Sequence, residues 1–439
     1  MSIFRRKWQT VASAALAAAI AVPALAPAHI QAQSASAPKV KLVFWHHNDA
    51  SWIKAYKSLT TAYEKLHPNV TISEQTYSFS DLPTKLQTVA GTSSAPDVVG
   101  IFGTNVTTFA RSGKFDAVPS SIYTTRQMQD TYYAAATGAG LYNGKYYSIP
   151  HEYNVENDGM LVSPQAFKGA GITHYPTTWA ELRADAAKLT TRSSGRVKRA
   201  GFLFVTLGST PSFFMGLILQ QPGGYYFSPD KVHVNFNTPQ AAKALQEMAN
   251  LQQYGSLRDF PINVLDVSDY FFRGQAAIAF RGSWTIAVGQ TLYPKVKFDY
   301  VTMPSFTRGV PPYFAAESGW SDAVTANSPH KDVAWDFVKF MNSKDNARYW
   351  NITTSTIPAR KDLTDDAAFL KVNPLLKPTL GILKYGRWVG PVQDRYTFFN
   401  SSTRYIEKVF NHSMGIPDAL KAMTSEINAA IDKQLGNGQ

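Results

Sequence analysis

The chain has 439 residues, of which 44% are hydrophobic and 17% charged, with a net charge of +12 and no cysteine. This composition can build a sizeable core, and the length predicts two or three domains or lobes. The lack of cysteine excludes disulfides, thiol catalysis, cysteine zinc sites, iron–sulfur clusters and lipid attachment through an N-terminal cysteine.

The N-terminus has the three parts of a cleavable secretory signal, which we place at residues 1–32. Three basic residues at 5–7 precede an apolar core at 11–22, and prolines and small residues follow. The apolar core is shorter than the roughly 20 residues that cross a bilayer, so we favour a signal peptide over a membrane anchor. Cleavage after Ala28 or after Ala32 fits the pattern.

The mature chain keeps a basic surplus. The signal contains three of the 43 Lys and Arg and no acidic residue, so the net charge falls from +12 to +9. The basic residues are scattered and form no run of five, which favours a generally basic surface over a nucleic-acid site, although an anionic ligand stays open.

Strands and helices alternate from residue 39 to Gly113. We expect strands at 39–45, 70–74 and 97–102, and helices at 52–66, after Asp81, and at 104–112. Short connections between them are typical of a mainly parallel sheet covered by helices. Ligands of such sheets bind beyond the carboxyl ends of the strands, which indicates the segments 45–48 and 102–105.

The pattern then changes to longer and more varied connections. Asn143-Gly144 predicts the turn of a hairpin within 142–150. Thr178 with Glu181, and Thr238 with Pro239, predict helix N-termini. Further strands are expected at 201–207, 275–280 and 299–303, and amphipathic helices at 332–342, 345–349 and 417–435.

Short motifs follow one another in an order that is known from one family. They are KLVFW at 41–45, GTSSAPDVV at 91–99, FARSGKFDAV at 109–118, GKYYSIP at 144–150, PTTWAEL at 176–182 and FFRGQAAIAFRGSW at 271–284, followed by Met303-Pro304, the turn at 317–321 and Ile357-Pro358. From about 39 to 435 the chain resembles the family-1 extracellular solute-binding proteins of ABC importers, the sugar-binding group that includes maltose-binding protein. Val162-Ser163 departs from the family's usual Tyr-Asn, which leaves the ligand open rather than the fold.

The resemblance implies an α/β, two-lobed periplasmic-binding-protein fold. Each lobe would be a mainly parallel sheet flanked by helices, and the lobes would close on a ligand by hinge motion. The implied boundaries are 39–150 plus 304–352 for the N-terminal lobe, 158–298 plus 360–435 for the C-terminal lobe, and about 151–157, 299–303 and 353–359 for the crossover hinges. The resemblance also implies a monomer that binds no nucleic acid and meets permease subunits in the inner membrane. Since no lipidation cysteine is present, we expect it to diffuse freely in the periplasm.

Aromatic and polar residues at the implied cleft are the candidate ligand contacts. They are Trp45, His46, Asn105, Glu152, Tyr153, Trp284 and Trp320, with Arg360 and Trp388 as weaker candidates. Sugars suit this mixture, because their C–H faces pack on aromatic rings while their hydroxyls need charged or amide partners.

Several of these residues have a purely structural alternative. Trp45 and Trp284 could pack in the core, His46 could be a hydrogen-bonded loop residue, and Glu152 could bridge the lobes. The pair His46-His47 does not predict a metal site, because adjacent residues of a strand point to opposite faces and no third ligand is placed to join them. We expect no metal and no cofactor.

The expected function is capture of a mono- or oligosaccharide for an ABC importer. The alternative within this class is glycerol-3-phosphate or a related polyol phosphate. Two features support it: FWH at 44–46, and the guanidinium groups of Arg281, Arg360 and Arg387, which could bind a phosphate. We do not expect iron or a polyamine as the ligand. The chain shows neither the cluster of tyrosines with a carboxylate that would bind iron nor the cluster of acidic residues that would bind a polyamine.

An exported carbohydrate-active enzyme is the alternative of another class. It would need a pair of carboxylates on opposite sides of the substrate. Glu152, Glu156 and Asp158 could supply them, but nothing in the local sequence identifies two of them as such a pair. The chain has no G-x-S-x-G elbow, HExxH motif or P-loop, so we do not expect an enzyme.

Overall fold

The computed structural model describes residues 38–155, 159–204, 210–230, 232–260, 268–390 and 395–436. The described residues from Lys39 onward form one compact unit. The predicted signal at 1–32 lies outside the described residues, as do Glu156 and Asp158.

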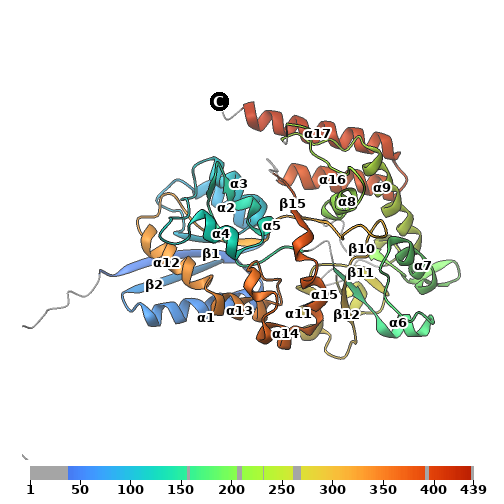
Figure 1. Ribbon diagram of the computed structural model, residues 1–439, viewed down its shortest axis with the longest axis horizontal. Helices are drawn as coiled ribbons and strands as arrows, with labels where there is room; N and C mark the ends of the chain where they lie inside the picture. Colours follow the sequence, from blue (N-terminus) through green and yellow to red (C-terminus); the bar gives the residue numbers. More distant parts are fainter. Residues whose placement is uncertain are drawn as a thin grey trace, which may run out of the picture. The chain divides into compact units, whose positions relative to one another are not determined.

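The first main sheet has the strand order β2–β1–β3–β14–β6, and its neighbouring strands β1 and β2 (blue) are labelled in Figure 1. Its strands are β1 (Val40–His47), β2 (Val70–Tyr77), β3 (Val98–Phe102), β6 (Ile149–Pro150) and β14 (Trp320–Val324). β1 is parallel to β2 and β3, whereas β14 is antiparallel to β3 and β6. All residues of β3 and β14 are buried, so these two strands form the centre of the sheet.

The second main sheet has the order β10–β11–β7–β12. Its strands are β7 (Gly159–Val162), β10 (Leu203–Phe204), β11 (Ile278–Phe280) and β12 (Asp299–Thr302). β10 and β11 are parallel, and β7 is antiparallel to both of its neighbours. Both main sheets are therefore mixed. The segment predicted as the second crossover, 299–303, pairs with β7 as β12 over most of its length.

The remaining elements cover these sheets or connect them. The helices of the first part of the chain are α1 (Ala50–Leu66), α2 (Asp81–Val89), α3 (Gly103–Arg111), α4 (Thr125–Thr131), α5 (Ala134–Thr137), α6 (Pro164–Gly169), α7 (Trp179–Leu189) and α8 (Thr210–Leu219). The later helices are α9 (Pro239–Leu251), α10 (Asp269–Phe272), α11 (Thr285–Leu292), α12 (Lys331–Met341), α13 (Lys344–Thr354), α14 (Ala367–Val372), α15 (Lys377–Leu380), α16 (Arg395–Phe410) and α17 (Ile416–Gly436). The smaller strand pairs are β4 (Leu141–Tyr142) with β5 (Lys145–Tyr146), β8 (Thr191–Ser193) with β9 (Arg196–Arg199), and β13 (Phe314–Ala316) with β15 (Gly386–Trp388).

Local sequence signals explain how several of these elements begin and end. Asp49 caps α1, because its carboxylate accepts hydrogen bonds from the backbone N–H groups of Ser51 and Trp52 at 2.8 and 3.3 Å. Asn143 and Gly144 have φ angles of 47° and 75°, as the predicted hairpin turn between β4 and β5 requires. The turn confirms the prediction from Asn143-Gly144, and the Asp49 cap begins α1 shortly after the end of β1.

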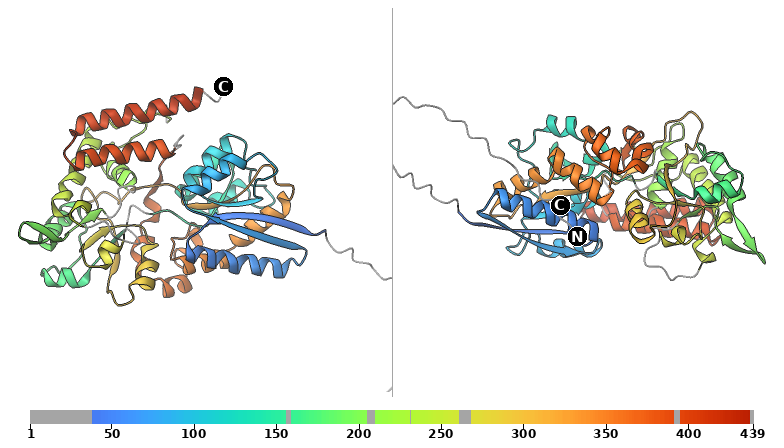
Figure 2. Two further views of the ribbon diagram at one scale, coloured as in Figure 1. Left: turned by 180° about the vertical axis from the view of Figure 1, so that it is seen from behind. Right: turned by 90° about the horizontal axis from the view of Figure 1, so that it is seen from below.

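Two cores hold the chain together. One core packs mainly against the first sheet and includes Leu42, Phe44 and Trp335, while the other packs mainly against the second sheet and includes Met160 and Phe213. Figure 1 shows α1 (blue) and α13 (orange) packed together, and Figure 2 shows α16 and α17 (red) packed together from two further directions. Within the described ranges, no helix combines the length and the apolar character that a membrane span requires.

A histidine links α17 to the segment that precedes α9. The His233 ring hydrogen-bonds Asp230 through Nδ1, and its Nε2 lies 2.8 Å from Asp432 Oδ1 on α17. The hydrogen bonds with Asp230 and Asp432 raise the pKa of His233 above its usual value of 6.5. Because the folded state holds this proton more tightly, the stabilisation is complete below the unfolded pKa and is lost as the pH rises through the raised pKa.

The substitution His233→Gln therefore has a pH-dependent expected effect. The variant should lower the free energy of unfolding at about pH 6 and should have a smaller effect at about pH 9. Urea denaturation of both proteins at the two pH values measures the difference. An equal loss of unfolding free energy at both pH values would show that the charge of His233 does not contribute to stability.

Candidate functional site

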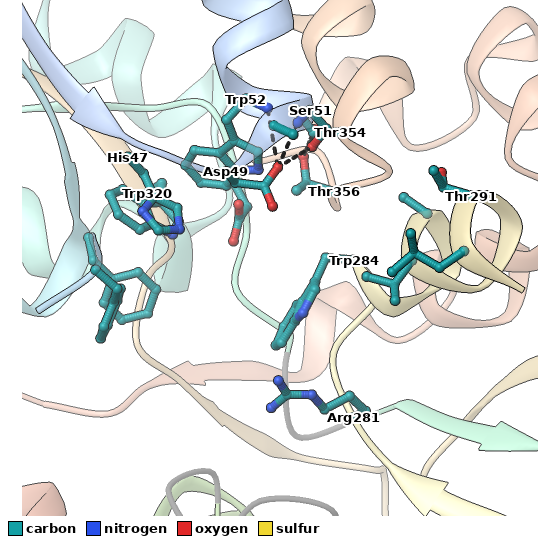
Figure 3. Close-up of a pocket in the computed structure, with 17 residues that line it drawn as sticks. His47, Asp49, Ser51, Trp52, Arg281, Trp284, Thr291, Trp320, Thr354 and Thr356 are labelled. Atoms are coloured by element: carbon teal, nitrogen blue, oxygen red, sulfur yellow. Dashed lines mark hydrogen bonds between the residues drawn. The ribbon is translucent and has the colours of Figure 1, made fainter. Parts of the chain in front are cut away.

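A cavity of about 540 Å³ is lined by residues that follow strands of both main sheets. The ends of β1 and β3, the starts of α1 and β14, and the end of α13 contribute from the first sheet and its helices. The segment after β11 and one face of α11 contribute from the second. Figure 3 shows Trp320 with His47 on one side of the opening, and Trp284 with α11 on the other.

Aromatic rings form the wall on the side of the first sheet. The His47 ring stacks on Trp320 with 5.1 Å between ring centroids, and the Trp52 ring meets Trp320 edge-on at 4.7 Å. Phe79 and Phe102 pack edge-on against Trp320 at 5.9 and 5.7 Å. Burial lowers the pKa of His47 below its usual value, so its ring is neutral at pH 7. This wall is an uncharged surface of mutually contacting aromatic rings.

The facing wall begins at Trp284, the N-cap residue of α11. The guanidinium carbon of Arg281 lies 4.9 Å from the centroid of the Trp284 ring, a cation–π distance. A Cβ on Gly282 would lie 1.7 Å from that ring, so only glycine lets the indole fold back over its own chain. The Gly-x-Trp motif thus has a physical reason: the glycine makes room for the ring that lines the cavity.

The Asp49 carboxylate and the hydroxyls of Ser51, Thr354 and Thr356 lie at the upper edge of the cavity in Figure 3, across from Arg281. Asp49 caps α1 through one oxygen, which also accepts the Ser51 hydroxyl at 2.6 Å. The hydroxyls of Thr354 and Thr356 lie 2.8 Å apart at the end of α13. The Asp49 carboxylate offers acceptor oxygens to a hydroxylated ligand, while the two threonine hydroxyls are also engaged by the Trp350 carbonyl and the Asn351 amide.

Glu152 lines the cavity from the first predicted crossover, and its backbone is enclosed on two sides. Tyr153 N–H donates to the carbonyl of Ile357 at 2.8 Å, which places the first and third predicted crossovers side by side. On the other side, Gly319 has a φ of 128°, and a Cβ there would lie 2.2 Å from the Glu152 carbonyl oxygen. The position of Glu152 is therefore determined by close backbone contacts.

A buried polar network lies behind the aromatic wall. The Asp322 carboxylate accepts hydrogen bonds from the Tyr56 hydroxyl at 3.1 Å and from the Asn342 amide at 2.9 Å. His151 Nδ1 lies 3.1 Å from the same carboxylate, with both side chains at most 3% exposed. The network joins α1, β14, the C-cap of α12 and the first predicted crossover.

Three of the nine predicted contacts lie on this cavity: Glu152, Trp284 and Trp320. Trp45 is instead 7% exposed in the core, with its ring against Tyr77. His46 is fully buried, and its Nε2 lies 3.2 Å from Glu74.

The other four predicted residues also lie off this cavity. Asn105 is buried in α3, and Tyr153 is buried with its hydroxyl donating to the Leu383 carbonyl. Arg360 pairs with Asp362 at 2.9 Å, and Trp388 packs against Gly138, where a Cβ would come within 2.4 Å of the indole.

Sequence reasoning missed most of the cavity lining. It named His46, whereas the next residue, His47, reaches the cavity together with Asp49, and it missed the α11 face altogether. The alternation along β1 indicates that neighbouring residues face opposite ways, but not which of the two histidines faces the ligand side. Among the residues that the structure describes, no group of three or more His, Asp or Glu side chains is arranged to hold a metal ion.

The relatives that share sequence with this chain include two whose names state a ligand. The galactooligosaccharide-binding protein of Bacillus subtilis (strain 168) is 23% identical over 375 residues, which cover 81% of each protein. The sn-glycerol-3-phosphate-binding periplasmic protein UgpB of Yersinia pestis is 26% identical over 251 residues, which cover 54% of this chain and 56% of that protein.

A solved structure and a family model agree with the fold. The ABC substrate-binding protein Lmo0181 from Listeria monocytogenes, in complex with cycloalternan, superposes with a TM-score of 0.75 at 23% identity. The superposition covers 90% of this chain and 99% of that one, and it supports the periplasmic-binding-protein fold. The family model for bacterial extracellular solute-binding proteins matches residues 58–378. The chain therefore belongs to the bacterial extracellular solute-binding protein family.

Proposed function

We propose that this solute-binding protein captures a neutral carbohydrate in the cavity and delivers it to the permease of an ABC importer. The observation that carries the proposal is the pair of indoles on facing walls, Trp320 on one side and Trp284 on the other, in a cavity that the carboxylates of Glu152 and Asp49 also line. Sugar rings pack their C–H faces on indoles, and carboxylates accept hydrogen bonds from sugar hydroxyls. Membership of the family makes the chain a transport component rather than an enzyme.

The charges at the cavity favour a neutral ligand over a phosphate. Two carboxylates, Asp49 and Glu152, face one guanidinium, Arg281, which already stacks on Trp284. With His47 neutral, the lining has a net negative charge, which opposes a dianionic phosphate. A galactooligosaccharide-binding relative and a cycloalternan complex agree with this preference, while the glycerol-3-phosphate-binding relative keeps polyol phosphate as the second candidate.

Removal of the Glu152 charge should change the affinity for the two candidate ligands in opposite directions. Glu152→Gln should weaken binding of a neutral glycan by about tenfold, because a charge-assisted hydrogen bond becomes a neutral one. The same variant should strengthen binding of glycerol-3-phosphate, because a negative charge leaves the site. Calorimetric titration measures both, with Glu407→Gln on α16 as the matched control. Tighter glycan binding by Glu152→Gln would contradict the proposed role of the carboxylate.

Closure of two lobes is part of the proposal. One lobe contains the first main sheet and the other the second, with crossovers at about 151–157, 299–303 and 353–359. Because the cavity takes residues from elements of both sheets, a bound sugar would join the lobes and stabilise the closed form. Export through the N-terminal signal would place the protein in the periplasm, where the closed form meets the permease.

A thermal-shift screen tests the proposed function. Mono-, di- and trisaccharides of the glucose, galactose and mannose series are compared with glycerol-3-phosphate. Neutral glycans should raise the melting temperature without being hydrolysed, because a ligand that binds only the folded state stabilises it. A shift by phosphorylated ligands alone would replace the first candidate with the second.

A further inference from the structure

Helix α11 presents two different apolar faces. Thr285, Ile286 and Gly289 are buried in the protein. Ala287, Val288, Thr291 and Leu292 line the cavity instead, and they continue from Trp284 at spacings of three, four, seven and eight residues. These spacings place the five cavity residues in one stripe along the helix. A stripe of this kind normally packs into a core, but here it faces an open cavity.

We call Trp284, Ala287, Val288, Thr291 and Leu292 the α11 stripe. This stripe is longer than a single sugar ring. Eight residues of helix separate Trp284 from Leu292, a distance of about 12 Å along the axis. A pyranose ring spans only a few ångströms between its opposite carbons. One ring on Trp284 would therefore leave the far end of the stripe uncovered.

The far end of the stripe is also exposed in the ligand-free chain. Leu292 lines the cavity and is 57% exposed, and on the facing wall Phe79 is 37% exposed. Both side chains still offer apolar surface that a longer ligand can remove from water. A monosaccharide seated on Trp284 has no contact with Leu292, whereas a chain of rings that follows the helix reaches it.

We propose that the α11 stripe selects for chain length, and that the preferred ligand is an oligosaccharide whose rings run along α11 from Trp284 to Leu292. This inference rests on the proposed function, because it takes the ligand to be a glycan. Leu292 is then a specificity-determining residue for the outer ring. The hydroxyl edge of the chain faces Asp49, Thr354 and Thr356, which line the cavity at its polar edge.

The test compares chain length with and without Leu292. Calorimetric titration uses glucose, maltose and maltotriose, with the galactose and mannose series in parallel, on the wild type, Leu292→Ser and Leu66→Ser. Leu66 is a matched control, because it is also the last residue of a helix, is 65% exposed and does not line the cavity. Affinity should rise from mono- to trisaccharide, and Leu292→Ser should weaken trisaccharide binding by about fivefold while leaving monosaccharide binding unchanged.

Three outcomes would overturn the inference. Equal affinity for mono- and trisaccharide would refute the chain-length role while leaving carbohydrate binding in place. An equal loss for both ligands in Leu292→Ser would show that Leu292 acts in lobe closure and not on the outer ring. Binding of glycerol-3-phosphate without any glycan would remove the proposed function and this inference together.

Discussion

Replacement of Trp284 by alanine should weaken glycan binding by about 1–3 kcal/mol, or roughly ten- to hundredfold, and leave the protein folded. The indole forms the wall opposite Trp320, and its loss removes one of the two surfaces on which a sugar ring can pack. The same change also removes the cation–π contact between the Trp284 ring and the guanidinium of Arg281, which lines the cavity beside it. Calorimetric titration with the best glycan from the screen measures the loss of affinity.

Trp388→Ala is the control for this variant. Trp388 is a tryptophan that packs against Gly138 and does not line the cavity. This control should lower the free energy of unfolding through the space that it leaves, with little change in affinity. Unchanged affinity in Trp284→Ala, or a larger loss in Trp388→Ala, would contradict the assignment of the two residues.

Removal of the Asp322 carboxylate should cause the largest loss of stability. Asp322→Ala should lower the free energy of unfolding by about 3–5 kcal/mol, because it breaks a buried network and removes the carboxylate that three side chains share. The Tyr56 hydroxyl, the His151 ring and the Asn342 amide all meet this carboxylate. Burial and the nearby Asp322 raise the pKa of Tyr56 well above its usual value, so its hydroxyl stays protonated and must donate.

An exposed aspartate provides the comparison. Asp130 pairs with Arg126 at 3.4 Å on α4, with both side chains more than half exposed. Asp130→Ala should cost less than about 1 kcal/mol, as exposed ion pairs do. Urea denaturation of both variants gives the two values. Similar losses in the two variants would mean that the buried network contributes little, and that the aromatic wall in front of it is held by packing alone.

Local sequence signals predicted much of the fold. Asn143-Gly144 forms the expected hairpin turn, and Thr178 with Glu181 forms a capping box at the start of α7. These signals act within a few residues, so their physics is present in the sequence itself. Helix α8 was not predicted as a helix, because nearly all its residues are apolar and buried, which leaves no alternation to read.

The site was harder to predict than the fold. Trp284 could be placed through its Gly-x-Trp motif, and Trp320 through the small-residue turn before it. Trp45 and His46 lie on the predicted strand but off the cavity, because the register of β1 against its neighbours decides which side chain reaches the surface. Arg360 is engaged by Asp362, a local pairing that a motif does not reveal. Contacts between distant segments thus decide which aromatic residues line the cavity.

The most direct measurement is a crystal structure of the protein with the glycan that stabilises it most. A sugar ring between Trp284 and Trp320, with a hydroxyl hydrogen-bonded to Glu152, is the predicted result. An oligosaccharide should extend from there along α11 to Leu292. A ligand bound away from this cavity, or a phosphate bound at Arg281 with no glycan between the two indoles, would contradict the account.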